Sequence, residues 1–267
     1  MELLLGLLQE EKNQYLEINL NWIKDILIKL GSLDRRWIFL IITFTVLIPI
    51  YYPYYFSLPI VPSESTIKTF DEMDNLKKGD KVLMSFEYGP STAPEIQPMA
   101  VALLKHLLYK DVKVYMMALW PEGQFMAADA VTEAKKWLIV DKEILDIEDY
   151  VNLGFKAGGE SVIKGVASDI QKVYTKDINF VSLDSVISND FYTSKDSVFN
   201  VNDFQFVISL SAGSPGTEEW VQYACDPSNV PLLTGCTSIM VTSSIPYLSS
   251  GQLQGLIAGM PGAAEYE

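Results

Sequence analysis

The chain has 267 residues, a net charge of −14 and enough residues for one substantial folded domain or two small ones. So acidic a surface repels phosphate backbones and anionic lipid headgroups, which excludes nucleic acid as a favoured partner. It favours cationic ligands, metal ions and basic protein surfaces, although solubility alone also explains an excess of acidic residues.

Residues 1–33 are predicted to form a cytoplasmic amphipathic helix. Apolar residues recur there at intervals of three and four positions: Leu16, Leu20, Ile23, Leu27 and Leu30. Acidic as well as basic residues lie between them, whereas helices that bind anionic lipid are mainly basic. A helix of a partner protein is therefore the favoured contact, and the membrane interface is the alternative.

Residues 34–56 are predicted to be a transmembrane signal anchor. The 20 residues from Trp37 to Phe56 carry no charge, and at a rise of about 1.5 Å they match a hydrocarbon core of ~30 Å. Pro49 to Tyr55 should kink or stop this helix near its outer end. Lys and Arg are more frequent before the stretch than after it, which predicts a cytoplasmic N-terminus and an extracytoplasmic main domain in the cell membrane. A buried helix of a soluble protein is the alternative.

Residues 57–79 contain prolines and serines typical of an extended linker, and residues 80–267 are predicted to form an α/β domain. Strands are expected at 81–87, 112–119, 150–155, 204–210 and 238–242. Helices are expected at 96–109, 124–140, 160–174, 217–225 and 249–258. This alternation predicts a three-layer Rossmann-like or flavodoxin-like domain with a mainly parallel sheet. The final residues form no polar tail, so we expect the natural chain to continue.

Ligands of such domains bind at the carboxyl ends of the strands, where four loops should meet, at 87–92, 120–123, 156–161 and 211–217. The candidate ligand-binding residues are Glu87, Tyr88, Trp120, Gly213, Ser214, Gly216 and Thr217. The fourth loop is the most specific candidate, because its small residues let backbone N–H groups surround an anion such as a carboxylate or phosphate. The alternative is that any tight strand-to-helix turn requires glycine and serine.

Acidic residues gather at the same edge: Glu87, Glu122, Glu160, Glu218 and Glu219. They are candidates for binding a divalent or organic cation, but those in the first turn of a helix are also explained by the helix dipole. Cys225 and Cys236 are either a disulfide pair or two buried free thiols. No residue spacing indicates a structural metal site.

Several enzyme classes lack their required residues. The chain has one histidine, His106, which lies in the middle of a predicted helix, so a Ser-His-Asp hydrolase has no base at the ligand edge. No glycine-rich dinucleotide or nucleotide motif is present, so no cofactor is predicted. We therefore expect a non-catalytic, membrane-anchored binding or scaffold subunit of a membrane protein assembly, whose outer domain binds a small anion. The alternative is a carboxylate-based or metal-assisted hydrolase that uses Glu87 with Glu122 or Glu160.

Overall fold

The computed structural model describes residues 24–26, 28, 34–52, 55, 60–138, 148–189 and 198–267. The chain divides into two compact units, Met1–Pro59 and Ile60–Glu267. Most of the amphipathic helix predicted within residues 1–33 lies outside the described residues. The described residues at 24–26 and 28 are helical.

In the first unit, helix α2 (Arg35–Tyr51) begins at Asp34, whose side chain accepts a hydrogen bond of 3.1 Å from the backbone N–H of Arg36. The helix contains Pro49 and ends two residues later, so it is shorter than the predicted span to Phe56. None of its side chains is buried. Within the described part of the chain, no helix combines the length and the apolar character needed to cross a membrane.

The first helix of the second unit is α4 (Glu64–Asp74), so the extended linker predicted at 57–79 is wrong for residues 64–74, while residues 57–59 lie outside the described part of the chain. Ser63 begins this helix by accepting a hydrogen bond of 3.4 Å from the N–H of Thr66. The helix packs closely on the last strand, because a Cβ atom on Gly255 would lie 2.1 Å from the hydroxyl oxygen of Thr69. The α/β domain therefore includes residues 64–74, whose surrounding Pro- and Ser-containing sequence predicts a linker.

Six parallel strands form one sheet in the order β3-β2-β1-β4-β5-β6. They are β1 (Lys81–Glu87), β2 (Lys113–Ala118), β3 (Tyr150–Phe155), β4 (Phe206–Ser211), β5 (Leu232–Cys236) and β6 (Leu253–Ala258). This confirms the Rossmann-like α/β class, and the strand order reverses between β1 and β4. The predicted strand at 238–242 and helix at 249–258 are wrong, since residues 238–240 form a turn before helix α12 (Val241–Ser250) and residues 253–258 form β6.

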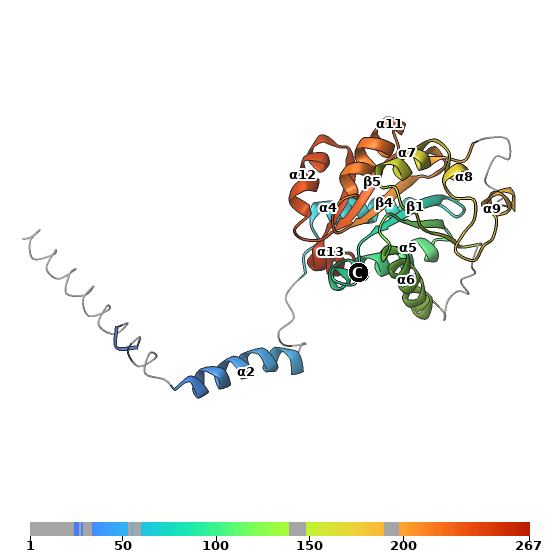
Figure 1. The fold of residues 1–267 in the computed structure, drawn as a ribbon. Coiled ribbons are helices and arrows are strands. Elements are labelled where there is room, and N and C mark those ends of the chain that lie inside the picture. Colours follow the sequence, from blue (N-terminus) through green and yellow to red (C-terminus); the bar gives the residue numbers. More distant parts are fainter. Residues whose placement is uncertain are drawn as a thin grey trace, which may run out of the picture. The chain divides into compact units, whose positions relative to one another are not determined.

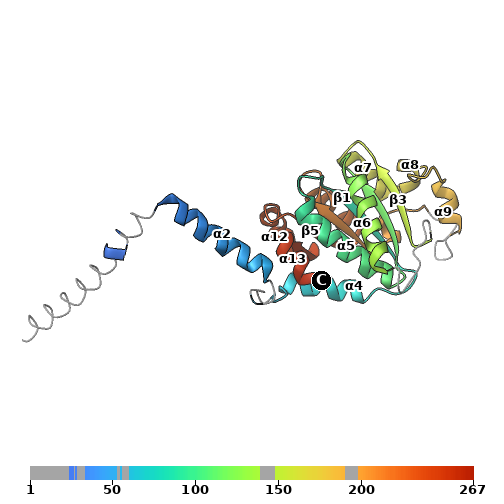
Figure 2. The ribbon, with the colours of Figure 1, turned by 90° about the horizontal axis from the view of Figure 1, so that it is seen from below.

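Helices cover both faces of the sheet (Figures 1 and 2). One face is covered by α4, α5 (Ala93–Tyr109), α6 (Gly123–Leu138) and α13 (Gly259–Tyr266). The other face is covered by α7 (Glu160–Ser168), α8 (Ile170–Val173), α9 (Leu183–Asn189), α10 (Thr217–Trp220), the π-helical turn η2 (Val221–Cys225) and α12 (Val241–Ser250). The remaining short helices are η1 (Val201–Asp203) and α11 (Asp226–Ser228).

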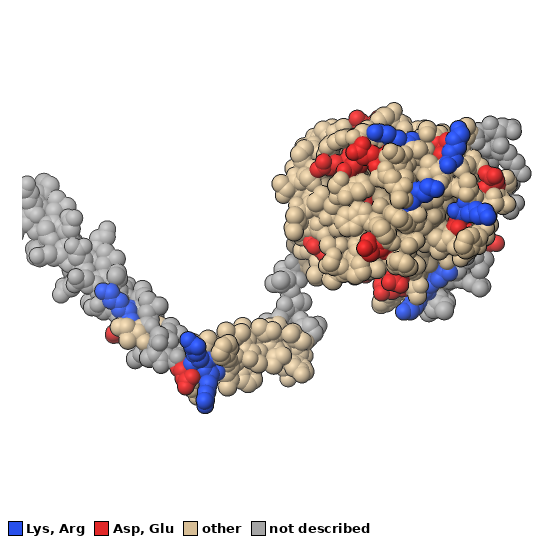
Figure 3. All heavy atoms as spheres, in the orientation of Figure 1, with Lys and Arg blue, Asp and Glu red and all other residues tan. Residues whose placement is uncertain are grey.

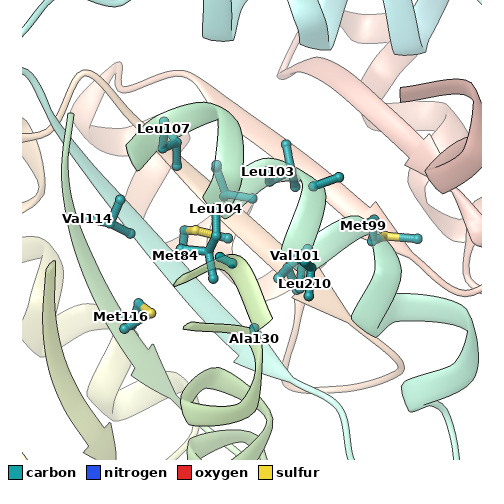
Figure 4. Packing of buried hydrophobic residues seen from close by; sticks show 14 of the residues in the cluster. Met84, Met99, Val101, Leu103, Leu104, Leu107, Val114, Met116, Ala130 and Leu210 are labelled. Atoms are coloured by element: carbon teal, nitrogen blue, oxygen red, sulfur yellow. The ribbon is translucent and has the colours of Figure 1, made fainter. Parts of the chain in front are cut away.

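Successive residues of β1 face opposite cores. Met84 packs with the leucines of α5 and with β2 in the first core (Figure 4), whereas Leu83 belongs to the second. The same alternation directs Ser85 and Glu87 toward the second face, although every residue of β1 is buried. The polar side chains of Ser85 and Glu87 are therefore buried on the second face of the sheet, at the carboxyl end of β1.

Candidate functional site at the carboxyl edge of the sheet

The four loops that follow β1 to β4 meet at one edge of the sheet, as the sequence predicts. A Cβ atom on Gly89 would lie 3.4 Å from Cβ of Glu122, and one on Gly213 would lie 3.3 Å from Cζ2 of Trp120. One on Gly159 would lie 3.8 Å from Cγ of Pro215. Glu87 and Ser211 are register partners at the ends of β1 and β4. This is the point of strand-order reversal, where ligands of open α/β sheets bind.

Glu87 lies at the centre of a buried polar cluster. Its Oε1 accepts hydrogen bonds from the hydroxyl of Ser85 and, at 3.2 Å, from Nε1 of Trp220. Its Oε2 accepts one of 3.3 Å from the hydroxyl of Ser209. Burial raises the pKa of Glu87 to about 8 despite these three donors. The side chain is therefore mainly a neutral acid at pH 7, and with no exposed surface it does not reach a ligand.

Threonine and serine hydroxyls extend the cluster toward the loop after β4. The hydroxyls of Thr217 and Thr234 lie 2.6 Å apart, and Thr234 also donates to the carbonyl of Ser209 at 3.0 Å. Ser211 donates to the carbonyl of Gly213 at 2.8 Å. A Cβ atom on Gly216 would lie 2.0 Å from the hydroxyl oxygen of Ser211, so no side chain fits there. Gly216 and Thr217 are thus buried structural residues rather than exposed ligand contacts.

Tyr88 also lies in the interior rather than at the ligand edge. It belongs to the first core, and its hydroxyl donates to Oε1 of Gln97 at 2.5 Å. Of the seven predicted ligand-binding residues, Trp120 and Gly213 are half-buried, Ser214 is exposed, and the other four are buried. The accessible part of the predicted site therefore consists of Trp120, Gly213 and Ser214.

The carboxylate of Glu219 occupies the position predicted for an external anion. It accepts a hydrogen bond of 2.7 Å from the N–H of Gly216 and another from the hydroxyl of Ser214. The adjacent pocket has a volume of about 390 Å³ and is lined by Gly158, Gly159, Glu160, Ser161, Ser214, Pro215 and Glu219. Its two carboxylates repel an anion, so these residues favour a basic group over the predicted anionic ligand.

Cys225 and Cys236 are free, buried thiols, which is the second of the two alternatives that the sequence left open. Burial raises the pKa of both, that of Cys236 to about 11, so neither is a reactive thiolate at neutral pH. Across the described ranges, no group of three or more His, Cys, Asp or Glu side chains is arranged to hold a metal ion.

The carboxylates do not form an accessible acid and base pair. Glu87 is fully buried and hydrogen-bonded to Trp220, whereas Glu122 and Glu160 are exposed at the loops. A glycosidase-type mechanism requires both carboxyl groups to flank one substrate bond. The arrangement therefore gives no support to the alternative of a carboxylate-based hydrolase.

Sequence reasoning missed three members of the buried cluster: Ser85, Ser209 and Thr234. A signal was present, since Ser85 with Glu87 and Ser209 with Ser211 are spaced two apart at the ends of neighbouring strands. That spacing places the side chains of both pairs, Ser85 with Glu87 and Ser209 with Ser211, on one face of the sheet. It was obscured because both strands also have the continuous apolar character of buried parallel strands.

No family model matches this chain, and no curated protein or solved structure matches it. A function is therefore inferred from the residues of the chain itself.

Proposed function

We propose that the chain is a non-catalytic binding or scaffold subunit, attached to a membrane through residues 34–56, with its α/β domain on the extracytoplasmic side. The observation that carries this proposal is helix α2. After Arg36 it has no charged residue, and none of its side chains is buried. A helix that is apolar all round needs lipid or the helices of another protein around it.

The ends and the polar groups of α2 support lipid as that environment. Figure 3 shows charged side chains at the beginning of the helix and uncharged ones along the rest of its visible side. The hydroxyls of Thr43 and Thr45 donate to the carbonyls of Phe39 and Ile41 at 2.8 and 2.9 Å. Both hydroxyls therefore have a hydrogen-bond acceptor within the helix, which a hydrocarbon environment without water requires.

The length of the apolar stretch also bears on the proposal. The 17 residues of α2 cover about 25 Å, which is less than the ~30 Å of a hydrocarbon core. The uncharged sequence continues from Tyr51 to Phe56 and carries four tyrosines, which favour the headgroup region. We therefore place Arg35 and Arg36 at the cytoplasmic surface and the tyrosines at the opposite one.

The α/β domain supports binding rather than catalysis. Glu87 is fully buried and inaccessible, and the N–H group of Gly216 in the loop beside Ser214 already bonds to the carboxylate of Glu219. This carboxylate and the net charge of −14 favour a basic surface on a partner protein. We propose such a protein partner in preference to a small anion, with residues 1–33 providing a second contact in the membrane assembly.

Extraction of membranes with alkaline carbonate tests this proposal. The full chain should remain in the membrane pellet. The double substitution Ile42→Asp and Val46→Asp should release it, because one charge at the centre of a span costs ~2.5–3.5 kcal/mol. A matched control, Phe125→Asp with Ile239→Asp, changes two exposed apolar residues of the α/β domain and should remain in the pellet. Recovery of the unmodified chain in the supernatant would refute the proposal.

A further inference from the structure

A second site lies on the outer side of the helical layer formed by α4, α5, α6 and α13, toward which Figure 2 looks. It is an open pocket of about 670 Å³ whose walls include Phe70, Lys105, His106, Tyr109, Trp137 and Tyr266. Ligand pockets usually have volumes of roughly 300–1,000 Å³. The residues from α5 and α6 come from the C-terminal halves of these helices, so the pocket is distant from the loops at the carboxyl edge.

The walls of this pocket are mainly aromatic, and several rings are exposed. Trp137 and Tyr109 are 69% and 66% exposed, and Phe70 is 44% exposed. The ring of Phe70 lies 5.0 Å from that of His106 and 5.8 Å from that of Tyr266, measured between centroids. Exposed aromatic residues gathered from three helices are typical of a binding surface rather than of ordinary surface composition. Flat ring faces of this kind suit a planar ligand.

His106 contributes a neutral ring to the wall. Its Nδ1 lies 2.8 Å from the hydroxyl oxygen of Tyr266, which fixes the orientation of the imidazole. Burial and the charge of Lys110 lower the pKa of His106, while Asp74, 3.7 Å from Nε2, acts in the opposite direction. The imidazole is therefore uncharged at pH 7 and presents an aromatic surface.

Lys105 supplies a positive charge at the wall of the pocket. Its Nζ lies 4.4 Å from the centroid of the Trp137 ring, and its side chain is only 23% exposed. Its ionic partner is Oε1 of Glu267 at 3.4 Å, on a side chain that is 57% exposed. Exposed ion pairs are weak because water screens them. An acidic group on a ligand in the pocket can therefore replace Glu267.

We propose that this pocket binds a planar aromatic ligand that carries one acidic group. The ring system packs against the exposed aromatic side chains, and the acidic group pairs with Lys105. This inference is independent of membrane attachment, because every residue in it belongs to the α/β domain.

Calorimetric titration with 2-naphthoate, and with 2-naphthamide as its uncharged counterpart, tests the proposal. Residues 60–267 contain all six strands and both cores, so this segment is suitable as the sample. We expect one molecule of 2-naphthoate to bind per chain. Lys105→Gln should weaken its affinity about fivefold, to the level of 2-naphthamide. Trp137→Ala should weaken both ligands more than ~10-fold, because aromatic side chains dominate such contacts.

Phe125→Ala is the matched control, because Phe125 is an aromatic residue of the same helix, is 62% exposed and lies outside the pocket. It should bind both ligands like the unmodified domain. Any of three results would overturn the proposal: no binding of 2-naphthoate at millimolar concentration, equal affinities for the two ligands, or an equal loss in Phe125→Ala and Trp137→Ala. Circular dichroism of each variant separates a loss of binding from a loss of folding.

Discussion

Glu87→Gln should remove a pH dependence of stability that the buried acid gives to the α/β domain. Glutamine has the shape of the protonated acid and keeps an oxygen that accepts from Trp220. Its amide oxygen, at the position of Oε1, can accept from Trp220 and Ser85, and its NH2 group, at the position of Oε2, can donate to the hydroxyl of Ser209. The substitution therefore retains the contacts of the neutral side chain and removes only its titration.

The magnitude follows from the pKa of the folded state. The pKa of Glu87 is raised from 4.5 to about 8, so between these values the unfolded chain has lost a proton that the folded chain retains. The stabilisation is complete below pH 4.5, falls by about 1.4 kcal/mol per pH unit and is lost by about pH 8. Over the whole window the loss is on the order of 4–5 kcal/mol.

Urea unfolding of residues 60–267 at pH 5, 6.5 and 8, followed by circular dichroism, measures this effect. The free energy of unfolding of the unmodified domain should fall relative to that of Glu87→Gln as the pH rises. Glu122→Gln removes an exposed acid at the same edge and should follow the unmodified domain. Equal pH dependence in the unmodified domain and in Glu87→Gln would refute the assignment of Glu87 as a buried neutral acid.

Two further predictions concern packing at the carboxyl edge and the thiols. Gly216→Ala should destabilise the domain by about 3 kcal/mol, because its Cβ would overlap the Ser211 hydroxyl, and urea unfolding should show a smaller loss for Gly213→Ala. Equal losses would contradict the packing described for the loop. Cys225 and Cys236 should react with a thiol reagent only after unfolding, because both are buried. Rapid labelling of the native domain would contradict their burial.

The first four strands were predictable because they are apolar runs bounded by turn residues. The last two were not, because the run from Ser238 to Thr242 resembles a strand while Ile239 is 86% exposed in the structure. The true strand β5 has only five residues, and tertiary pairing with β4 and β6 rather than local propensity decides its conformation. Short apolar runs carry this ambiguity between strand and other structure.

The predicted ligand loop shows what local composition leaves out. The glycines and serines from 211 to 217 resemble an anion site, but Glu219 returns to the N–H of Gly216 and occupies the position of the anion. The spacing of three between these two residues is that of a capping box, so the contact between Glu219 and the N–H of Gly216 could be predicted from the sequence. The aromatic pocket around Trp137 was not predictable, because its walls combine α4, α5 and α6 with α13, which follows α6 by more than a hundred residues of sequence.

Labelling of single cysteines in intact cells tests the membrane attachment most directly. Ser185→Cys places an exposed thiol on α9, and Ser32→Cys adds a thiol in the sequence before the apolar stretch. The two native cysteines are buried, so the unmodified chain serves as an unreactive control. A membrane-impermeant maleimide should label Ser185→Cys in intact cells and Ser32→Cys only after permeabilisation. Equal protection of both positions until the cells are opened would contradict an extracytoplasmic α/β domain anchored by residues 34–56.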